Sequence, residues 1–493
     1  MIKITDTVLR KQKNFWNGCV FHPTDAVEDP WGRRILDRMA EDGAIRMVRI
    51  YTMFEDIVYL GENGEICYDF RLNDLRLDYL VEKGYDLTLA YAGIPDAIAT
   101  STKFQTTSAK GKTRYKGKMW NTCPPKDYKL WEELCYEYTK HIIERYGIDT
   151  VKNWHCHCFN EPDHPPYLLG ELGDAEGTTM RRCEEYCRLY EAFERGVRRA
   201  SEEVQIGGPA LACHMDFLGG WLDYVKEHNL KLDFVTCHYY GTTPKALHEK
   251  RDRITAETLI RKQKKFEDCI AAHGFSHIPL VIDEWGMACA GFCDSEKYPE
   301  MLVRETEVYS SYFAKLIARY LEENARLDTL LICLSGQHEM TKDFTGFRNF
   351  FSLNFIPKPI YNCYVLAAKL GNQLLKAECE NENVSIIPTK TEKGYGVLLT
   401  YSSEFFEEDL PEVTESVCFA DDVGDKTLTV WCIDKEHTNP YRLYQREGMD
   451  EPSAEQLQML RDEGRLKPVK VQKGSEPLSL KLTANCTYFI EAK

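Results

Sequence analysis

The sequence predicts a (β/α)8 barrel of the α/β class, a TIM barrel, followed by a C-terminal β-sandwich domain. Between about residues 14 and 375, short apolar runs alternate with longer segments that repeat apolar residues at i, i+3 or i+4 and i+7. Eight such pairs are typical of a closed barrel. After residue 374 the pattern changes to short, roughly alternating runs separated by turn residues, which indicates an antiparallel β-domain.

The barrel strands expected from the sequence are apolar for most of their length, as is usual for parallel strands buried on both faces. They are residues 15–22, 45–51, 87–91, 151–159, 205–210, 234–240, 280–285 and 329–335. An open doubly wound sheet would usually have a glycine-rich phosphate-binding turn after its first strand. Residues 23–26 read Pro-Thr-Asp-Ala and contain no glycine, which favours the barrel.

The change of pattern divides the chain into two expected domains. We expect the catalytic barrel to span residues 14–375 and the accessory β-sandwich to span residues 376–493. The β-sandwich is predicted from the runs 384–387, 394–401, 427–433 and 478–482. Residues 1–13 are a candidate for an additional strand of this accessory domain.

Composition and charge exclude several classes of protein. The formal net charge of −16 over 493 residues argues against nucleic-acid binding, which depends on neutralising phosphates. We find no run of 18 apolar residues, so no membrane span is expected. The N-terminus lacks the apolar segment of a signal peptide, and 19 cysteines cannot all form pairs. We therefore expect a cytoplasmic protein with reduced thiols.

Two glutamates stand at the ends of predicted strands. Glu161 follows the fourth strand in an Asn-Glu-Pro sequence, and Glu284 ends the apolar run of the seventh. The carboxyl ends of barrel strands share one face, where residues distant in sequence meet. Hydrolysis of a glycosidic bond needs two carboxyl groups, one to protonate the leaving oxygen and one to attack carbon or activate water. Surface salt bridges are the alternative for each glutamate, but their joint positions favour catalysis by both.

Several short stretches are similar to one family of barrel enzymes. They are residues 120–131 (WNTCPPKDYKLW), 144–147 (ERYG), 160–162 (NEP), 237–241 (CHYYG), 358–361 (KPIY) and 434–441 (DKEHTNPY). On these stretches the chain resembles glycoside hydrolase family 39, the β-xylosidase and α-L-iduronidase family, over nearly its whole length. The resemblance implies a retaining enzyme, with Glu161 as the general acid/base and Glu284 as the nucleophile that forms a covalent glycosyl-enzyme. The two sites must then differ in protonation, with Glu161 protonated and Glu284 ionised at the start.

The resemblance also implies roles for supporting residues. Asn160 would hydrogen-bond the sugar 2-OH, and Tyr240 would donate to Glu284 with His238 beside it. Arg49, on the second strand, would keep Glu284 charged. Arg49 could instead serve a structural ion pair, and His238 could be a core histidine with satisfied hydrogen bonds.

Departures from the family pattern concern the sugar pocket. Tyr51 stands where family β-xylosidases usually have histidine, and residues 90–95 read AYAGIP instead of a Glu-Leu-Gly-Phe-Met-Pro-like run. Around the eighth strand, residues 334–339 (LSGQHE) replace a segment with tryptophan and acidic residues, and Gln337 is the substrate-binding candidate there. Trp285 would either stack on a sugar face or pack within the barrel.

The sequence therefore predicts a β-xylosidase-like retaining exo-glycosidase that acts on short oligosaccharides or glycosides. An α-L-arabinofuranoside, a β-galactoside or a uronide stays open as the substrate. The uronide is motivated by the loop 97–126, which has no acidic residue and carries Lys103, Lys110, Lys112, Arg114, Lys116, Lys118 and Lys126. A non-catalytic carbohydrate-binding barrel is the alternative of another class. Linkage and homo-oligomer formation are left open.

No metal or cofactor is expected. His155, Cys156, His157 and Cys158 alternate between the two faces of a strand, whereas zinc ligands must converge on one point. Cys183 and Cys187 are one helical turn apart on one face, which is the spacing of core residues.

Overall fold

The computed structural model describes the chain except for residues 23–25, 108–118, 166, 174, 290–294, 335–339 and 421–422. Eight parallel strands form a closed barrel. In order around the barrel they are β2 (Gly18–Phe21), β3 (Met47–Tyr51), β6 (Asp86–Tyr91), β9 (His155–Cys158), β10 (Gln205–Leu211), β11 (Phe234–Thr242), β12 (Leu280–Ala288) and β13 (Leu327–Leu334). The predicted barrel is confirmed, and each strand overlaps an apolar run of the sequence.

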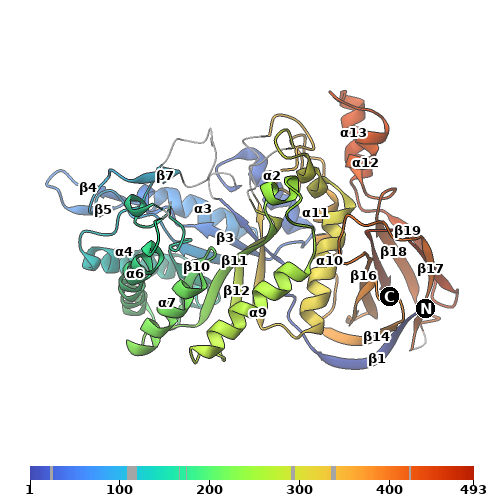
Figure 1. The fold of residues 1–493 in the computed structure, drawn as a ribbon, viewed down its shortest axis with the longest axis horizontal. Coiled ribbons are helices and arrows are strands. Elements are labelled where there is room, and N and C mark those ends of the chain that lie inside the picture. Colours follow the sequence, from blue (N-terminus) through green and yellow to red (C-terminus); the bar gives the residue numbers. More distant parts are fainter. Residues whose placement is uncertain are drawn as a thin grey trace.

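Helices surround the barrel (Figure 1). They are α2 (Pro30–Glu41), α3 (Arg71–Glu82), α4 (Tyr128–Tyr146), α5 (Ile148–Val151), α6 (Thr178–Ala200), α7 (Met215–Glu227), α8 (Pro244–His248), α9 (Glu257–Ala272), α10 (Glu307–Glu322) and α11 (Pro359–Ala367). Side-chain capping explains where two of these helices begin. At the start of α2 the Asp29 carboxylate accepts the backbone N–H groups of Trp31 and Gly32, and at the start of α4 the Asp127 carboxylate accepts that of Lys129.

Short elements extend the loops between the strands and helices. They are η1 (Phe54–Asp56), β4 (Val58–Leu60), β5 (Ile66–Tyr68), β7 (Gln105–Thr107), β8 (Met119–Asn121), η2 (Gly170–Leu172) and η3 (Pro299–Glu305). The basic loop 97–126 contains the β7–β8 ribbon. Its residues Lys110, Lys112, Arg114, Lys116 and Lys118 lie outside the described residues, so its role in substrate attraction stays a prediction.

The predicted C-terminal β-domain is confirmed as a curled, mostly antiparallel sheet of nine strands. Its order is β19 (Pro468–Lys473), β18 (Thr427–Ile433), β21 (Cys486–Ala492), β16 (Tyr395–Tyr401), β15 (Val384–Lys390), β14 (Gln373–Cys379), β1 (Ile2–Lys11), β17 (Val413–Phe419) and β20 (Leu478–Leu482). The N-terminal strand β1 pairs antiparallel with β14 and parallel with β17. Both chain ends therefore lie in this domain (Figure 1).

Helix α10 joins the two domains, because it packs against β15, β16 and β21 of the accessory sheet. At its start, the fully buried Glu307 accepts hydrogen bonds from Arg442 Nη2 (2.7 Å) and Asn439 Nδ2 (2.8 Å). Arg442 belongs to α12 (Pro440–Arg446), which with α13 (Ala454–Glu463) extends from the accessory sheet. The ion pair thus connects the barrel to this helical extension.

Replacing Glu307 by alanine is expected to lower the free energy of unfolding by about 2 kcal/mol, because Asn439 and the partly exposed Arg442 lose their charged acceptor. Denaturant unfolding measures this change. The control is Glu249→Ala, which removes an exposed pair with Arg251 (2.6 Å) and is expected to change stability by less than about 0.5 kcal/mol. Equal effects of the two substitutions would contradict a stabilising role for the Glu307 contact.

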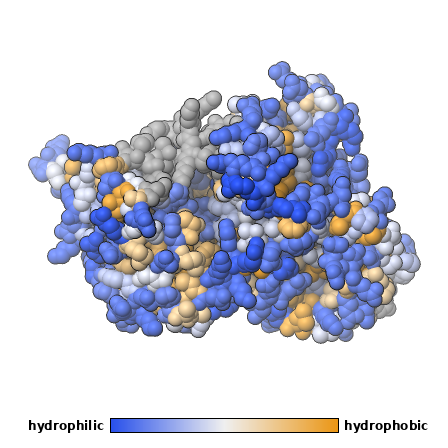
Figure 2. Space-filling view, viewed as in Figure 1, coloured by the Kyte–Doolittle hydropathy of each residue, from blue (hydrophilic) through white to orange (hydrophobic). Residues whose placement is uncertain are grey.

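The surface agrees with the charged composition. Figure 2 shows a mostly hydrophilic face, with hydrophobic residues in small separate groups. Among the helices that the structure describes, none combines the length and the apolar character that crossing a bilayer requires.

Candidate active site

Glu161 and Glu284 lie at the same end of the barrel with their carboxyl groups close together. Glu161 follows β9, and Glu284 is in the middle of β12. One carboxylate oxygen of each and one ring nitrogen of His238 all lie within 4.8 Å of one another. The Glu161 side chain is 17% exposed and that of Glu284 is 11% exposed. The two carboxyl groups therefore face one partly open space, and Glu161 is the more solvent-exposed of the two.

Irregular strand pairing in the barrel brings the side chains of the site together. The pairing of β11 with β12 shifts between Cys237 and His238, and the pairing of β12 with β13 shifts between Ile282 and Trp285. Such shifts break the strict alternation of side chains and are frequent beside active sites. As a result the consecutive residues Asp283 and Glu284 both contact Arg49.

Each oxygen of Glu284 has its own hydrogen-bond donors. The Tyr240 hydroxyl donates to Oε2 at 2.7 Å, and Arg49 Nη1 donates to Oε1 at 3.0 Å. The Tyr51 hydroxyl is 3.3 Å from Oε1. Arg49 Nη2 also donates to Asn160 Oδ1 at 2.7 Å, which orients the amide beside the acids. These contacts fix the carboxylate of Glu284 in one orientation.

Neighbouring positive charges keep Glu284 ionised. Burial alone would raise its pKa, but the charges of His238, Arg49 and Arg348 and the hydrogen bond from Tyr240 lower the pKa of Glu284 to about 2. A permanently ionised carboxylate with fixed orientation has the properties of a nucleophile.

His238 lies between the two glutamates and is buried. Its Nδ1 is 3.0 Å from Glu161 Oε1 and 3.8 Å from Glu284 Oε2. Burial alone would lower the pKa of His238, but the carboxylates of Glu284 and Asp283 and the contact with Glu161 raise it to about 10. His238 is therefore an imidazolium that donates from Nδ1 to Glu161, rather than a neutral core histidine.

Not all of the other predicted site residues reach the cluster around the two glutamates. Asn160, Tyr240, His238 and Arg49 join the cluster. Trp285 is fully buried and its ring stacks on that of Phe313 in α10, with centroids 5.8 Å apart, so the structure favours the packing alternative. Gln337 lies outside the described residues, and its contact with substrate stays a prediction.

Three residues in or beside the cluster were not among the predicted site residues, although Tyr51 was named as a departure in the sugar pocket. Tyr51 is two positions after Arg49 on β3, so strand alternation was a signal for it. Asp283 neighbours Glu284, and regular alternation would have placed it on the opposite face. The guanidinium of Arg348 lies 4.9 Å from the centre of the Tyr240 ring. Arg348 follows the eighth strand in a long connection whose path has no sequence signal.

Three groups among the described residues have the spacing of metal ligands. They are Glu161 with His238 and Glu284, Asp163 with Cys213 and His214, and Cys432 with Asp434 and His437. In the first group His238 is positively charged and Arg49 adjoins Glu284, which disfavours a cation. In the second, the Asp163 carboxylate already accepts the backbone N–H groups of residues 212, 213 and 214. The geometry thus gives no reason to assign a metal to the site.

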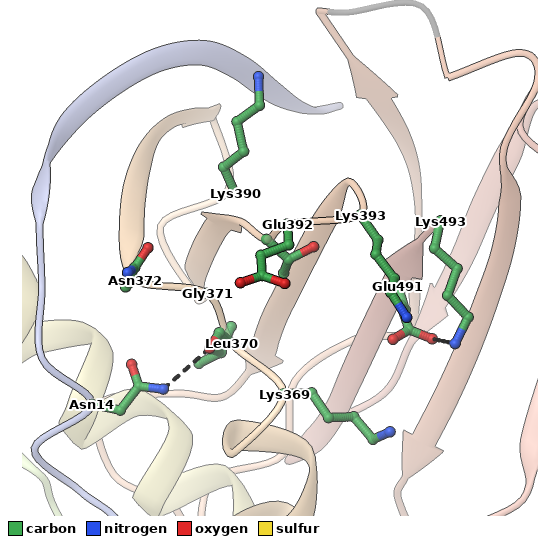
Figure 3. A pocket seen from close by; sticks show the side chains of 11 residues that line it. Asn14, Lys369, Leu370, Gly371, Asn372, Lys390, Glu392, Lys393, Glu491 and Lys493 are labelled. Atoms are coloured by element: carbon green, nitrogen blue, oxygen red, sulfur yellow. Dashed lines mark hydrogen bonds and ion pairs between the residues drawn. The ribbon is translucent and has the colours of Figure 1, made fainter.

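A separate pocket lies between the barrel and the accessory sheet (Figure 3). It is lined by Asn14, Lys369, Leu370, Gly371, Asn372, Lys390, Thr391, Glu392, Lys393, Glu491 and Lys493. Glu491 is paired with Lys493 at 2.9 Å. This polar pocket contains neither Glu161 nor Glu284, so it is not the candidate active site.

Comparison with known proteins places this chain in a family. The model of the family described as glycosyl hydrolases family 39 matches residues 1–477. The chain belongs to glycosyl hydrolase family 39. A family 39 relative, the β-xylosidase of Caldicellulosiruptor saccharolyticus, is 24% identical over 94% of this chain and 91% of its own length. The human α-L-iduronidase is 25% identical over 52% of this chain and 38% of its own length.

Solved structures agree on the fold of this family 39 member. A monomeric β-xylosidase from Caulobacter crescentus has a TM-score of 0.82 at 19% identity, covering 100% of this chain and 99% of its own. Membership of family 39 makes the chain a glycoside hydrolase with a sugar substrate.

Proposed function

We propose that this family 39 enzyme is a retaining exo-glycosidase that uses Glu284 as the nucleophile and Glu161 as the general acid/base. The observation that carries the proposal is the separation of the acids, whose nearest oxygens lie within 4.8 Å. Retaining enzymes hold their carboxyl groups about 5 Å apart, whereas inverting enzymes need about 6.5–9.5 Å to fit a water.

In the first step the ionised Glu284 attacks the anomeric carbon, and Glu161 gives its proton to the leaving oxygen. A covalent glycosyl-enzyme forms and the leaving alcohol departs. Arg49, Tyr51 and Tyr240 hold the attacking carboxylate in line. This orientation lowers the entropic part of the barrier, because the nucleophile does not have to search for its geometry.

In the second step Glu161 is a carboxylate and takes a proton from water. The water attacks the anomeric carbon from the side that the leaving group vacated, and the bond to Glu284 breaks to release its carboxylate, so the configuration of the substrate is restored. Asn160, whose Oδ1 is held by Arg49, presents its amide N–H group for the sugar 2-OH. That contact strengthens in the transition state.

A β-xyloside is the proposed substrate, because the relatives that match most of the chain are β-xylosidases. The test is a panel of nitrophenyl glycosides that includes β-xyloside, α-L-arabinofuranoside, β-galactoside and β-glucuronide. The highest kcat/KM is expected for the xyloside. No hydrolysis of any glycoside, together with tight sugar binding in calorimetry, would favour a carbohydrate-binding protein instead.

A uronide is the second candidate substrate. The buried Arg348 brings a positive charge beside Tyr240 and Glu284, and α-L-iduronidases are among the relatives. A uronide substrate would show kcat/KM falling with added salt, because screening weakens attraction between a carboxylate and basic residues. A neutral xyloside would not show this dependence.

Replacing Tyr240 by phenylalanine is expected to lower kcat about 30-fold, because the 2.7 Å hydrogen bond to the charged Glu284 is worth about 2 kcal/mol. The measurement is steady-state kinetics on an activated glycoside. Tyr239→Phe is the control, since the Tyr239 hydroxyl contacts Tyr320 behind the barrel wall. A Tyr240→Phe enzyme with unchanged kcat would contradict the positioning role of the hydroxyl.

A further inference from the structure

Asp283 is a fully buried carboxylate beside the nucleophile that the reaction steps above do not use. Its Oδ2 lies 3.1 Å from Arg49 Nε, 3.5 Å from His157 Nε2 and 3.5 Å from His238 Nε2. Among the described residues, neither of its oxygens accepts a well-aligned hydrogen bond. Ionic attraction to Arg49 and His238 is therefore what stabilises this charge inside the barrel.

The ring of His238 links Asp283 to the acid/base. Nε2 faces Asp283 and Nδ1 faces Glu161, at 3.5 Å and 3.0 Å. The side chain of His238 is 1% exposed, so water does not compete for either nitrogen. Asp283, His238 and Glu161 thus form a line across the barrel, from β12 through β11 to the end of β9.

We propose that Asp283 is a positioning residue that holds His238 as an imidazolium, with its Nδ1–H directed at the carboxylate that Glu161 becomes after protonating the leaving group. The proposal rests on the acid/base role of Glu161 in the proposed function. His238 keeps both of its protons throughout and transfers none. Its charge stabilises Glu161 as the base of the second step.

The charged surroundings of His238 agree with this role. The facing groups are Glu161 after β9, Asp283 and Glu284 on β12 and His157 on β9. The charges of Arg49 on β3 and Arg348 after β13 act on the same carboxylates. Strand β10, on the other side of β11, has no titratable residue in its sequence QIGGPAL. Burial and the nearby Arg49 lower the pKa of His157 to about 3, so His157 is neutral. With Glu161 ionised, three carboxylates face two guanidinium groups, those of Arg49 and Arg348, and a charge on His238 balances the third carboxylate.

The test is Asp283→Asn, assayed with an activated aryl glycoside for which the second step limits kcat. Glu161 must be ionised in that step, so kcat falls on the acidic side of the pH profile. Without Asp283 the charge on His238 is weakened, and this acidic limb is expected to move about one pH unit upward. At the pH where the wild-type kcat is half of its plateau value, the kcat of the variant is expected to be about tenfold below the variant's own plateau. A merely structural role would lower kcat by the same factor at every pH.

A matched control exists at the other end of the barrel. Asp328 Oδ2 lies 3.6 Å from His155 Nε2, which is another aspartate–histidine pair away from the acids. Asp328→Asn is expected to leave the pH profile unmoved. A His238→Gln enzyme is the second reference: adding Asp283→Asn to it is expected to move the acidic limb no further. A further shift in that background would overturn action through His238.

Should Asp283→Asn fail to fold, NMR of histidine-labelled wild-type enzyme still tests whether His238 is the imidazolium that the proposal requires. The His238 ring is expected to give imidazolium shifts at pH 8, and neutral-ring shifts there would overturn the proposal. An unmoved acidic limb in a folded, product-retaining Asp283→Asn enzyme would also overturn it. Failure of the proposed function is distinguishable, because it would appear in wild-type enzyme as inverted product or absent hydrolysis.

Discussion

Replacing Glu284 by glycine is expected to lower kcat by on the order of 10⁴- to 10⁶-fold, as loss of a nucleophile does in other covalent enzymes. The missing carboxylate leaves space beside the anomeric carbon for a small anion. With azide and an activated glycoside, turnover is expected to return and to yield a glycosyl azide of configuration opposite to that of the substrate. Mass spectrometry and NMR of the product measure both results.

The matched control for this experiment is Glu161→Gly with azide. In that variant the covalent intermediate on Glu284 still forms from an activated substrate, and azide attacks it as water would. The glycosyl azide is then expected to keep the configuration of the substrate. The same azide anomer from both variants would contradict the assignment of distinct roles to the two glutamates.

Replacing Glu161 by alanine is expected to have an effect that depends on the leaving group. A poorly activated alkyl glycoside needs protonation of its leaving oxygen, so kcat/KM for it should fall about 10²- to 10⁴-fold. A dinitrophenyl glycoside leaves without a proton, so kcat/KM for it should fall far less. Steady-state kinetics across a series of leaving groups measures the difference.

Equal losses for good and poor leaving groups would count against Glu161 as the acid. Asp163→Asn is a useful control, because Asp163 is two residues away and holds backbone N–H groups instead of facing substrate. Its effect should not depend on the leaving group.

The sequence was sufficient to predict the barrel because hydrophobic burial dominates its strands. Runs such as 280–282 and 329–334 are apolar since both faces of a barrel strand are covered, and this pattern survives without any knowledge of tertiary contacts. Their positions at the ends of predicted strands then indicate Glu161 and Glu284 as the candidate catalytic acids. The acids and their partners Arg49 and Tyr240 could be named in advance through the family resemblance.

The remainder depended on tertiary geometry. The inward position of Asp283 follows from shifts in strand pairing on both sides of β12, and alternation along one strand does not encode such a shift. Arg348 reaches the site from a connection after the eighth strand that has no regular period. The outward packing of Trp285 depends on Phe313, which comes from α10 and is distant in sequence.

The charge state of the site was also beyond sequence reasoning. His238 could be a core histidine or a site residue by sequence alone. Its distances of 3.0 Å to Glu161 and 3.5 Å to Asp283 make it a cation, because both contacts favour the protonated ring. Only the folded barrel assembles these groups from three strands.

The anomeric configuration of the first product tests the central claim most directly. Proton NMR during the first minutes of hydrolysis of an aryl β-glycoside, before mutarotation, shows which anomer the enzyme releases. The paired glutamates predict the β-anomer. Initial release of the α-anomer would show single displacement by water and would contradict nucleophilic attack by Glu284.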